Sequence, residues 1–309
     1  MGKIAFVFSG QGAQYPGMGK SLYENSKAAK KLYDKAESIR PGTMAQSFEG
    51  TEEELKITAN TQPCLYLADL AAALALCEKG ITPDAVAGFS LGEIAALAYG
   101  NAYTHEDGFR IVTARGAAMS KACETSEKTA MCAVLKLSNE KVTELCSKHE
   151  RLYPVNFNCP GQVSVSGLEE SVNALMEEVR SEGGRAVPLA VAGAFHSPFM
   201  ASAAKEFAKE LTKYDLTSPS VPVYSNLTAQ PYGDNIAESL EEQIKNPVLW
   251  QKTIETLIEE GFTEFIEVGV GKTLCGLIKK TSKDVSTYSV ENAETLEETV
   301  NALCEKGAI

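Results

Sequence analysis

The sequence lacks a hydrophobic run long enough to cross a membrane. Its longest apolar stretch, residues 64–77, is interrupted by Asp69 and is shorter than the roughly 20 residues that a spanning helix requires. Residues 1–8 contain one lysine followed by a short apolar segment, which is too short for a secretory signal. We therefore expect a cytoplasmic protein that does not associate with membranes.

Positive charge is also scarce. The chain has 29 Lys and Arg against 41 Asp and Glu, which gives a net charge of −12. A negative surface potential repels phosphate backbones and anionic lipids, so nucleic acid is excluded as an expected partner. An acidic partner would need a local basic patch, and Lys272, Lys279 and Lys280 could form one, although a solvated helix face is the simpler interpretation.

Paired cysteine motifs are absent. None of the eight cysteines forms a CxxC pair, and no histidine stands at zinc-ligand spacing from them. Free thiols of a reducing compartment are therefore expected rather than disulfides. We predict no metal site and no cofactor.

What the sequence does contain is an ordinary globular composition over 309 residues, without repeats. Three apolar segments, residues 4–8, 85–88 and 264–269, each lead through a glycine into helical periodicity. Strands that alternate with helices favour parallel pairing through crossover helices. The pattern predicts a three-layer α/β domain.

The middle of the chain has a different pattern. From residue 129 to residue 191 the expected order is strand, helix, strand, strand, helix, strand. This βαββαβ order is that of a ferredoxin-like unit. We therefore predict a ferredoxin-like subdomain at 124–196, inserted into a large domain made of 1–123 and 197–309.

One serine stands in the pattern GFSLG at residues 88–92. A sharp strand-to-helix turn exposes a serine oxygen, and the flanking glycines allow the strand and the helix to approach each other closely. The helix that follows places its positive end beside the serine. Ser90 is therefore a candidate nucleophile, and a Gly-rich turn without chemistry is the alternative.

A serine nucleophile needs a base, and the chain has only three histidines. His105 lies in a polar helix start and His149 at the end of a charged helix, so both are expected at the surface. His196 lies in the apolar segment VAGAFHSPFM, at the predicted seam between the domains. Because no orienting carboxylate can be identified, a Ser90–His196 dyad is favoured over a triad.

Arg115 lies on the apolar face of a predicted helix at residues 106–121. A buried guanidinium requires an anionic partner, because an unpaired buried charge is costly. The partner is either a carboxylate from a distant segment or a carboxylate of the substrate.

Two glycine-rich segments imitate nucleotide-binding motifs. SGQGAQYPG has Tyr15 where a dinucleotide fingerprint needs its third glycine, and VGVGKT has Ile266 where a P-loop needs its first. Gly10 and Gly12 can instead bring a backbone N–H close to an oxyanion formed at Ser90.

Nine segments between residues 4 and about 280 resemble the malonyl-CoA:acyl-carrier-protein transacylases of type II fatty-acid synthesis, in the same order. They are FVFSGQGAQ, TQPCLYLADLA, GFSLGEIAAL, VTARGAAM, NFNCPGQVSVSG, GAFHSPFM, VYSN, NPVLW and EVGVGK. The resemblance implies a hydrolase-like α/β domain with a ferredoxin-like insert. It also implies Ser90 as the acyl-accepting nucleophile and His196 as its base, oriented by the backbone carbonyl of Gln243.

The same resemblance implies an oxyanion hole made of the backbone N–H groups of Gln11 and Leu91. Arg115 would bind the free carboxylate of the malonyl group, and malonyl-CoA and acyl carrier protein would be the partners of a monomeric enzyme. Two positions depart from the family pattern. Phe89 replaces the usual histidine before the serine, and Ser9 replaces the usual proline in the first loop.

The sequence therefore predicts a ping-pong acyltransferase that passes malonyl from malonyl-CoA to acyl carrier protein. One alternative is an acyltransferase that serves a polyketide synthase, with the same chemistry and another carrier. A second is a serine thioesterase or hydrolase, in which water accepts the acyl group. A third is a carrier-binding scaffold without activity.

Overall fold

A five-stranded parallel sheet organises most of the chain in the computed structural model, which describes residues 2–124 and 127–307. The strand order is β7-β2-β1-β8-β9, and every neighbouring pair is parallel. The strands are β1 (Lys3–Phe8), β2 (Ala85–Gly88), β7 (Val223–Tyr224), β8 (Phe262–Val268) and β9 (Ser286–Val290). The parallel α/β expectation is confirmed.

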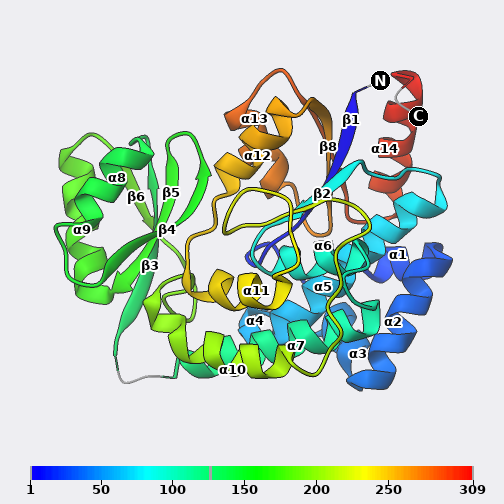
Figure 1. Ribbon diagram of the computed structural model, residues 1–309, viewed down its shortest axis with the longest axis horizontal. Helices are drawn as coiled ribbons and strands as arrows, with labels where there is room; N and C mark the ends of the chain where they lie inside the picture. The colour runs from blue at the N-terminus through cyan, green and yellow to red at the C-terminus, as the bar shows by residue number, and fades with distance from the viewer. Residues whose placement is uncertain (1, 125–126, 308–309) are drawn as a thin grey trace.

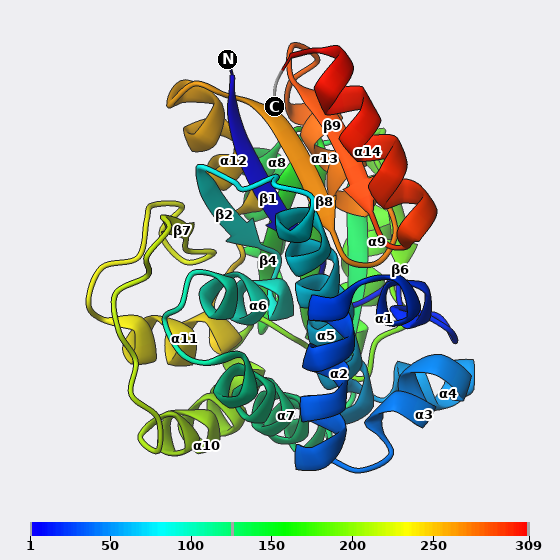
Figure 2. The ribbon, with the colours of Figure 1, turned by 90° about the vertical axis from the view of Figure 1, so that its right-hand side faces the viewer.

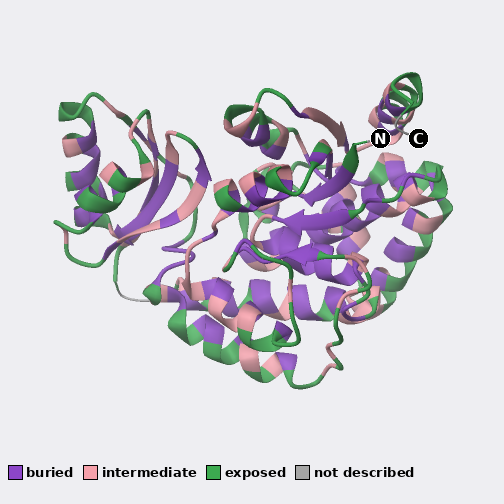
Figure 3. Ribbon diagram, turned by 45° about the horizontal axis from the view of Figure 1, so that its top comes forward, coloured by how far each residue is buried: buried purple, intermediate pink, exposed green. Residues whose placement is uncertain are grey.

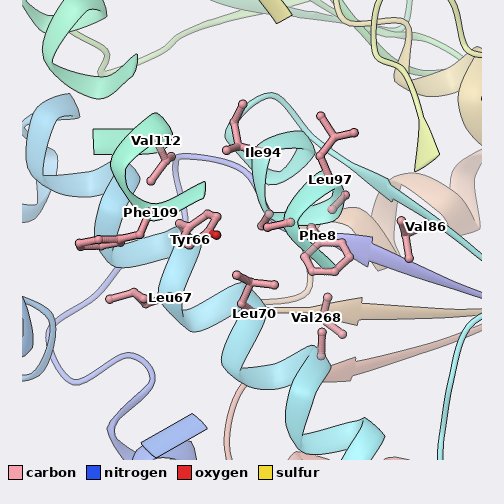
Figure 4. Packing of buried hydrophobic residues seen from close by; sticks show 14 of the residues in the cluster. Phe8, Tyr66, Leu67, Leu70, Val86, Ile94, Leu97, Phe109, Val112 and Val268 are labelled. Atoms are coloured by element: carbon pink, nitrogen blue, oxygen red, sulfur yellow. The ribbon is translucent and has the colours of Figure 1, made fainter. Parts of the chain in front are cut away.

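The central strands β1 and β2 are almost entirely apolar because helices cover both faces of the sheet. Phe6 and Phe8 of β1 enter one core with α5 (Thr58–Glu78) and α6 (Leu91–Tyr99), and Figure 4 shows Phe8 in this core from close by. Ala5 and Val7 of the same strand enter a second core with α12 (Trp250–Glu259) and α13 (Thr273–Thr281). Helix, sheet and helix form the three layers.

Helix α5 contains the longest apolar stretch of the sequence, and it is buried along nearly its whole length. It packs most extensively against α7 (His105–Ala122), and also against α6. Within the residues described, no helix is both long and apolar enough to span a membrane. The apolar stretch thus belongs to a core helix.

The remaining helices of this region surround the sheet. Figure 2 shows α14 lying along β9 at one edge and α2 in front of α5. They are α1 (Lys20–Asn25), α2 (Lys27–Ile39), α3 (Thr43–Glu49), α4 (Glu52–Lys56), α10 (Ala201–Leu211), α11 (Ile236–Lys245), α14 (Ala293–Glu305) and the short 3₁₀ helix η1 (Pro198–Met200).

A second, antiparallel sheet lies beside the first and forms the left side of Figure 1. Its order is β4-β5-β3-β6, with α8 and α9 on one face. The elements are β3 (Thr129–Leu135), α8 (Asn139–Cys146), β4 (Leu152–Cys159), β5 (Gln162–Leu168), α9 (Glu169–Ser181) and β6 (Arg185–Pro188). This is the expected βαββαβ order. It lies inside 124–196, and the domain bounds stay a prediction.

Alternate residues of the antiparallel sheet face different surroundings, as the period of two in a strand requires. Val163 and Val165 of β5 pack into the small core beneath α8 and α9. Ser164 and Asn158 lie on the opposite face, where Asn158 Nδ2 donates to Ser164 Oγ at 3.2 Å. The face turned away from α8 and α9 therefore carries polar side chains.

Figure 3 shows that both sheets are largely buried, while the outer sides of the helices are exposed.

Candidate active site

Ser90 occupies the sharp turn between β2 and α6. Its backbone has φ 55° and ψ −102°, a conformation that non-glycine residues rarely adopt. The turn also needs its two glycines. A Cβ on Gly88 would lie 2.0 Å from the carbonyl carbon of Gly92, and a Cβ on Gly92 would lie 2.4 Å from the backbone oxygen of Phe8. The GFSLG pattern therefore reflects a backbone crossing that larger residues cannot make.

Asn226, which follows β7, fixes this strained turn from behind. Its Oδ1 accepts the backbone N–H of Ser90 at 2.7 Å, and its Nδ2 donates to the carbonyl of Gly88 at 2.6 Å. The asparagine thus replaces hydrogen bonds that the turn cannot make within itself. Sequence reasoning assigned it no role, although it stands in the segment VYSN.

His196 lies between β6 and η1, with only 4 % of its surface exposed. Its Nε2 is 2.7 Å from Ser90 Oγ, and its Nδ1 is 2.9 Å from the backbone carbonyl of Gln243 in α11. A carbonyl can only accept, so Nδ1 carries the hydrogen and Nε2 of the neutral ring accepts from the serine hydroxyl. This is the tautomer that a general base requires.

Burial keeps the His196 ring neutral. Desolvation is the main cause that lowers its pKa from 6.5 to about 4, and the positive charge of Arg115 lowers it further. The hydrogen bond to the carbonyl of Gln243 acts in the opposite direction. At neutral pH the ring therefore has an unprotonated Nε2.

Arg115 of α7 is completely buried beside this pair. Its guanidinium donates to Gln62 Oε1 at 2.9 Å, to Gln243 Oε1 at 2.8 Å and to Ser90 Oγ at 3.1 Å. None of these partners is charged, and burial lowers the pKa of Arg115 to about 10, so the group remains cationic at neutral pH. Among the described residues the buried cation thus has no direct carboxylate partner, which favours the substrate over a distant side chain.

Two backbone amides belong to residues that line the same cavity. Gln11 follows β1 in the first loop and Leu91 is the first residue of α6, and both line the cavity that contains Ser90. The backbone N–H groups of Gln11 and Leu91 have no hydrogen-bond acceptor among the residues that the structure describes. Free amides beside a serine oxygen are able to stabilise a developing oxyanion.

The cavity around Ser90 has a volume of about 430 Å³. The loops that follow β1 and β2 form one wall, and the polar face of the antiparallel sheet forms the other, with Asn156, Asn158 and Ser164. No group of three or more His, Cys, Asp or Glu side chains in the described part of the chain could hold a metal ion. The site consists of organic acid–base and hydrogen-bonding groups.

The two departures from the family pattern have structural counterparts. Phe89 packs edge-on against Trp250, with ring centroids 5.5 Å apart, and lines the cavity beside Ser90. Ser9 Oγ donates to the buried Asp69 at 2.6 Å and accepts from the N–H of Val270 at 3.3 Å. Hydrogen bonds therefore tie the first loop to α5 and to the segment after β8.

Other residues singled out in the sequence lie away from this centre. His105 is half-buried at the start of α7, not fully at the surface, and burial lowers its pKa. The amino-terminal amides of α13, which follow the P-loop-like segment, bind the side chain of Glu267. Lys280 donates to Gln162 Oε1 at 3.1 Å at the cavity margin.

A strained serine turn and a serine–histidine pair on a parallel α/β sheet are typical of enzymes that act on acyl groups. The acyl transferase domain family matches residues 5–299. A malonyl CoA-acyl carrier protein transacylase from Bacillus subtilis is 41 % identical, covering 99 % of each chain. One from Synechocystis is 37 % identical, covering 95 % of this chain and 99 % of the other.

Solved structures agree. The malonyl CoA-acyl carrier protein transacylase from Clostridium perfringens superposes with a TM-score of 0.95 at 35 % identity, over 99 % of this chain and 98 % of the other. A malonyl-transacylase in complex with a type II PKS acyl-carrier protein gives 0.92 at 32 % identity, over 97 % and 99 %. The chain therefore belongs to the acyl transferase domain family and, within it, to the malonyl CoA-acyl carrier protein transacylases.

Proposed function

We propose that the chain moves the malonyl group of malonyl-CoA onto the phosphopantetheine thiol of acyl carrier protein, in type II fatty-acid synthesis. The observation that carries the proposal is the position of Ser90 Oγ, 2.7 Å from His196 Nε2 and 3.1 Å from Arg115 Nη2. The proposed base and the cation that would bind a carboxylate therefore both lie within hydrogen-bond distance of the proposed nucleophile, Ser90 Oγ. The relatives' names supply the donor and the acceptor.

In the first half-reaction, His196 Nε2 takes the hydroxyl proton while Ser90 Oγ forms a bond to the thioester carbon. The amides of Gln11 and Leu91 hold the negative charge of the tetrahedral intermediate. The carbon–sulfur bond then breaks, and the imidazolium returns its proton to the departing thiolate. Malonyl-Ser90 and free coenzyme A are the products.

In the second half-reaction, the thiol of the carrier repeats these steps in reverse. His196 takes the thiol proton, the sulfur attacks the ester carbon, and the proton returns to Ser90 Oγ as the ester bond breaks. A thioester replaces a thioester overall, so neither an oxidant nor an energy source is required. The ping-pong order follows from the single serine that serves both halves.

Arg115 supports malonyl as the acyl group. The residue lines the cavity, its guanidinium Nε is buried and has no partner among the described residues, and its two terminal nitrogens have uncharged partners. A malonyl carboxylate can bind such a fork in bidentate fashion. An acetyl group has no carboxylate, so it would gain nothing from this contact.

A polyketide carrier is the second candidate acceptor, and one observation favours it. The neighbour in complex with a type II PKS acyl-carrier protein superposes on this chain nearly as well as the Clostridium perfringens transacylase does. Transfer rates measured with a panel of carrier proteins would separate the two. Water as the acceptor, a hydrolase, would instead release free malonate without any carrier product.

Mass spectrometry of the intact protein tests the central step. Wild type mixed with malonyl-CoA should gain one malonyl group, which addition of carrier protein should remove. Ser90→Ala should gain none and should lose transfer by roughly 10⁴-fold or more, because the nucleophile is gone. A malonylated Ser90→Ala protein, or an unmodified wild type, would refute the covalent mechanism.

We also infer a cytoplasmic location and a monomeric enzyme. All eight cysteines are unpaired in the structure, as expected of a reducing compartment. The dyad, the two amides and the arginine come from one chain, so the site needs no second copy. Sedimentation of the purified protein tests the oligomeric state.

A further inference from the structure

A buried carboxylate that the mechanism does not use lies beneath the site. Glu93 is in the first turn of α6, three residues after Ser90, and has no exposed surface. A buried carboxylate is costly unless hydrogen bonds or a cation compensate it. Its contacts therefore indicate what it stabilises.

Both oxygens of Glu93 accept hydrogen bonds. Oε1 accepts the backbone N–H of Asn226 at 2.9 Å and the hydroxyl of Tyr232 at 2.6 Å. Oε2 accepts from Gln243 Nε2 at 2.6 Å. Asn226 is the residue that fixes the serine turn, and Gln243 is the residue whose carbonyl orients His196, so one carboxylate reaches both supports.

The side chain of Gln243 has only one workable orientation. Its Nε2 donates to the backbone carbonyl of Ser90 at 2.8 Å as well as to Glu93, and its Oε1 accepts from Arg115 Nη2 at 2.8 Å. A reversed amide would place its oxygen against two acceptors and its nitrogen against a guanidinium donor. Glu93 supplies one of the two acceptors that exclude this reversal.

Burial raises the pKa of Glu93 to about 6, while the hydrogen bonds from Tyr232 and Asn226 and the charge of Arg115 act in the opposite direction. At pH 7.5 the group is therefore mostly ionised. Its negative charge also raises the pKa of Arg115, against the effect of burial. The two charges are linked through the amide of Gln243 without direct contact.

We propose that Glu93 is a positioning residue that acts through the Gln243 side chain to aim the Arg115 guanidinium at the carboxylate of the acyl group. This inference rests on the proposed malonyl transfer. Glu93 touches neither the substrate nor the reacting atoms. It determines which acyl group is preferred, by holding Gln243 Oε1 towards Arg115.

The test compares malonyl-CoA and acetyl-CoA as donors in Glu93→Gln. The neutral amide cannot satisfy three donors, so the orientation of Gln243 should be lost. We expect kcat/KM for malonyl to fall at least tenfold more than kcat/KM for acetyl. Tyr232→Phe is the matched control, because it removes a hydrogen bond to the same carboxylate without touching Gln243, and it should leave the malonyl-to-acetyl ratio unchanged.

A second variant shows whether the effect passes through Gln243. Gln243→Met keeps the backbone carbonyl but removes the amide, so it should lower the ratio by itself, and adding Glu93→Gln should lower it no further. Gln243→Met by itself tests the contact between Gln243 and Arg115. If Glu93→Gln does not fold, Glu93→Asp takes its place, because it keeps the charge but withdraws the carboxylate from Gln243. Equal losses for both acyl groups, or a further fall of the ratio in the double variant, would overturn the inference. Absence of malonyl transfer by wild type would instead overturn the proposed function.

Discussion

The two sheets contribute to the site in different ways. The parallel sheet brings the carboxyl ends of β1 and β2 to one edge, and Gln11 and Ser90, three and two residues after these ends, line one cavity. The antiparallel sheet has no such convergence, and it contributes a polar wall together with the segment that carries His196. The proposed nucleophile and amides therefore come from a sheet that gathers strand ends, whereas the proposed base comes from the segment between the two sheets.

Among the changes that distinguish the two regions, the largest effect is expected at His196, in the segment between the two sheets. His196→Ala should lower kcat/KM for malonyl transfer by about 100- to 10,000-fold, the usual loss when a general base is removed. Steady-state kinetics at pH 7.5 would measure it, with circular dichroism to show that the fold is intact. A loss below tenfold in a folded protein would mean that His196 is not the base.

Arg115 tests the contribution of the parallel-sheet region to selectivity. Arg115→Ala should cost about 1.5–3 kcal/mol, the value of a hydrogen bond to a charged group, or roughly 10- to 150-fold in malonyl transfer. Acetyl transfer should fall much less, because acetyl has no carboxylate to bind. Similar losses for the two donors would show that the arginine supports the structure alone.

The two regions also meet electrostatically, because Arg115 lowers the pKa of His196. With a pKa of about 4, His196 stays unprotonated at pH 5–6, so kcat/KM for acetyl transfer should decline only as the pH falls towards 4. In Arg115→Gln this decline should begin at higher pH, measured with acetyl-CoA as donor for both proteins. An unchanged pH profile would mean that the charge of Arg115 does not affect the pKa of His196.

The same shift affects stability. Between pH 6.5 and about 4 the unfolded chain binds a proton at His196 that the folded chain does not. The contribution of this group to stability is therefore complete above pH 6.5 and is lost as the pH falls through that interval. Denaturant titrations at pH 7 and pH 5 measure this effect. The free energy of unfolding should fall more between the two pH values in wild type than in His196→Ala.

The smallest expected effect concerns the wall of the cavity. Leu189, just after β6, is half-buried and lines the cavity without contributing a polar group. Leu189→Ala should raise KM for malonyl-CoA about two- to fivefold, equivalent to roughly 0.4–1 kcal/mol, and leave kcat unchanged. A large fall in kcat would mean that this side of the cavity takes part in chemistry.

Local patterns predicted much of the fold. The expected strand AMCAVLKL, residues 130–137, and the expected helix at 168–182 correspond to β3 (Thr129–Leu135) and α9 (Glu169–Ser181), because alternation and helical periodicity are local signals. The strand expected up to residue 191 ends at Pro188. β7 and β9 were not predicted, because one has two residues and the other is mostly half-buried, without an apolar pattern.

Local patterns likewise reveal some residues of the candidate site and not others. Ser90, His196 and Arg115 could be singled out from local patterns and from elimination. The roles of Glu93 and Asn226 could not, because their hydrogen bond joins positions 133 residues apart, and nothing in either local pattern encodes it. The role of the Gln243 side chain depends on contacts with Ser90, Glu93 and Arg115, which lie in two other segments that only the folded chain brings together.

The acceptor that orients His196 belongs to the main chain, at Gln243. Genetic substitution there exchanges a side chain but cannot delete that oxygen, so the proton arrangement of the imidazole is protected against nearly every single-codon change. Scanning mutagenesis would consequently underrate position 243 as a support of the base. Only chemistry that rewrites the peptide linkage itself, such as an ester replacing the amide that follows, would weaken this acceptor and expose its value.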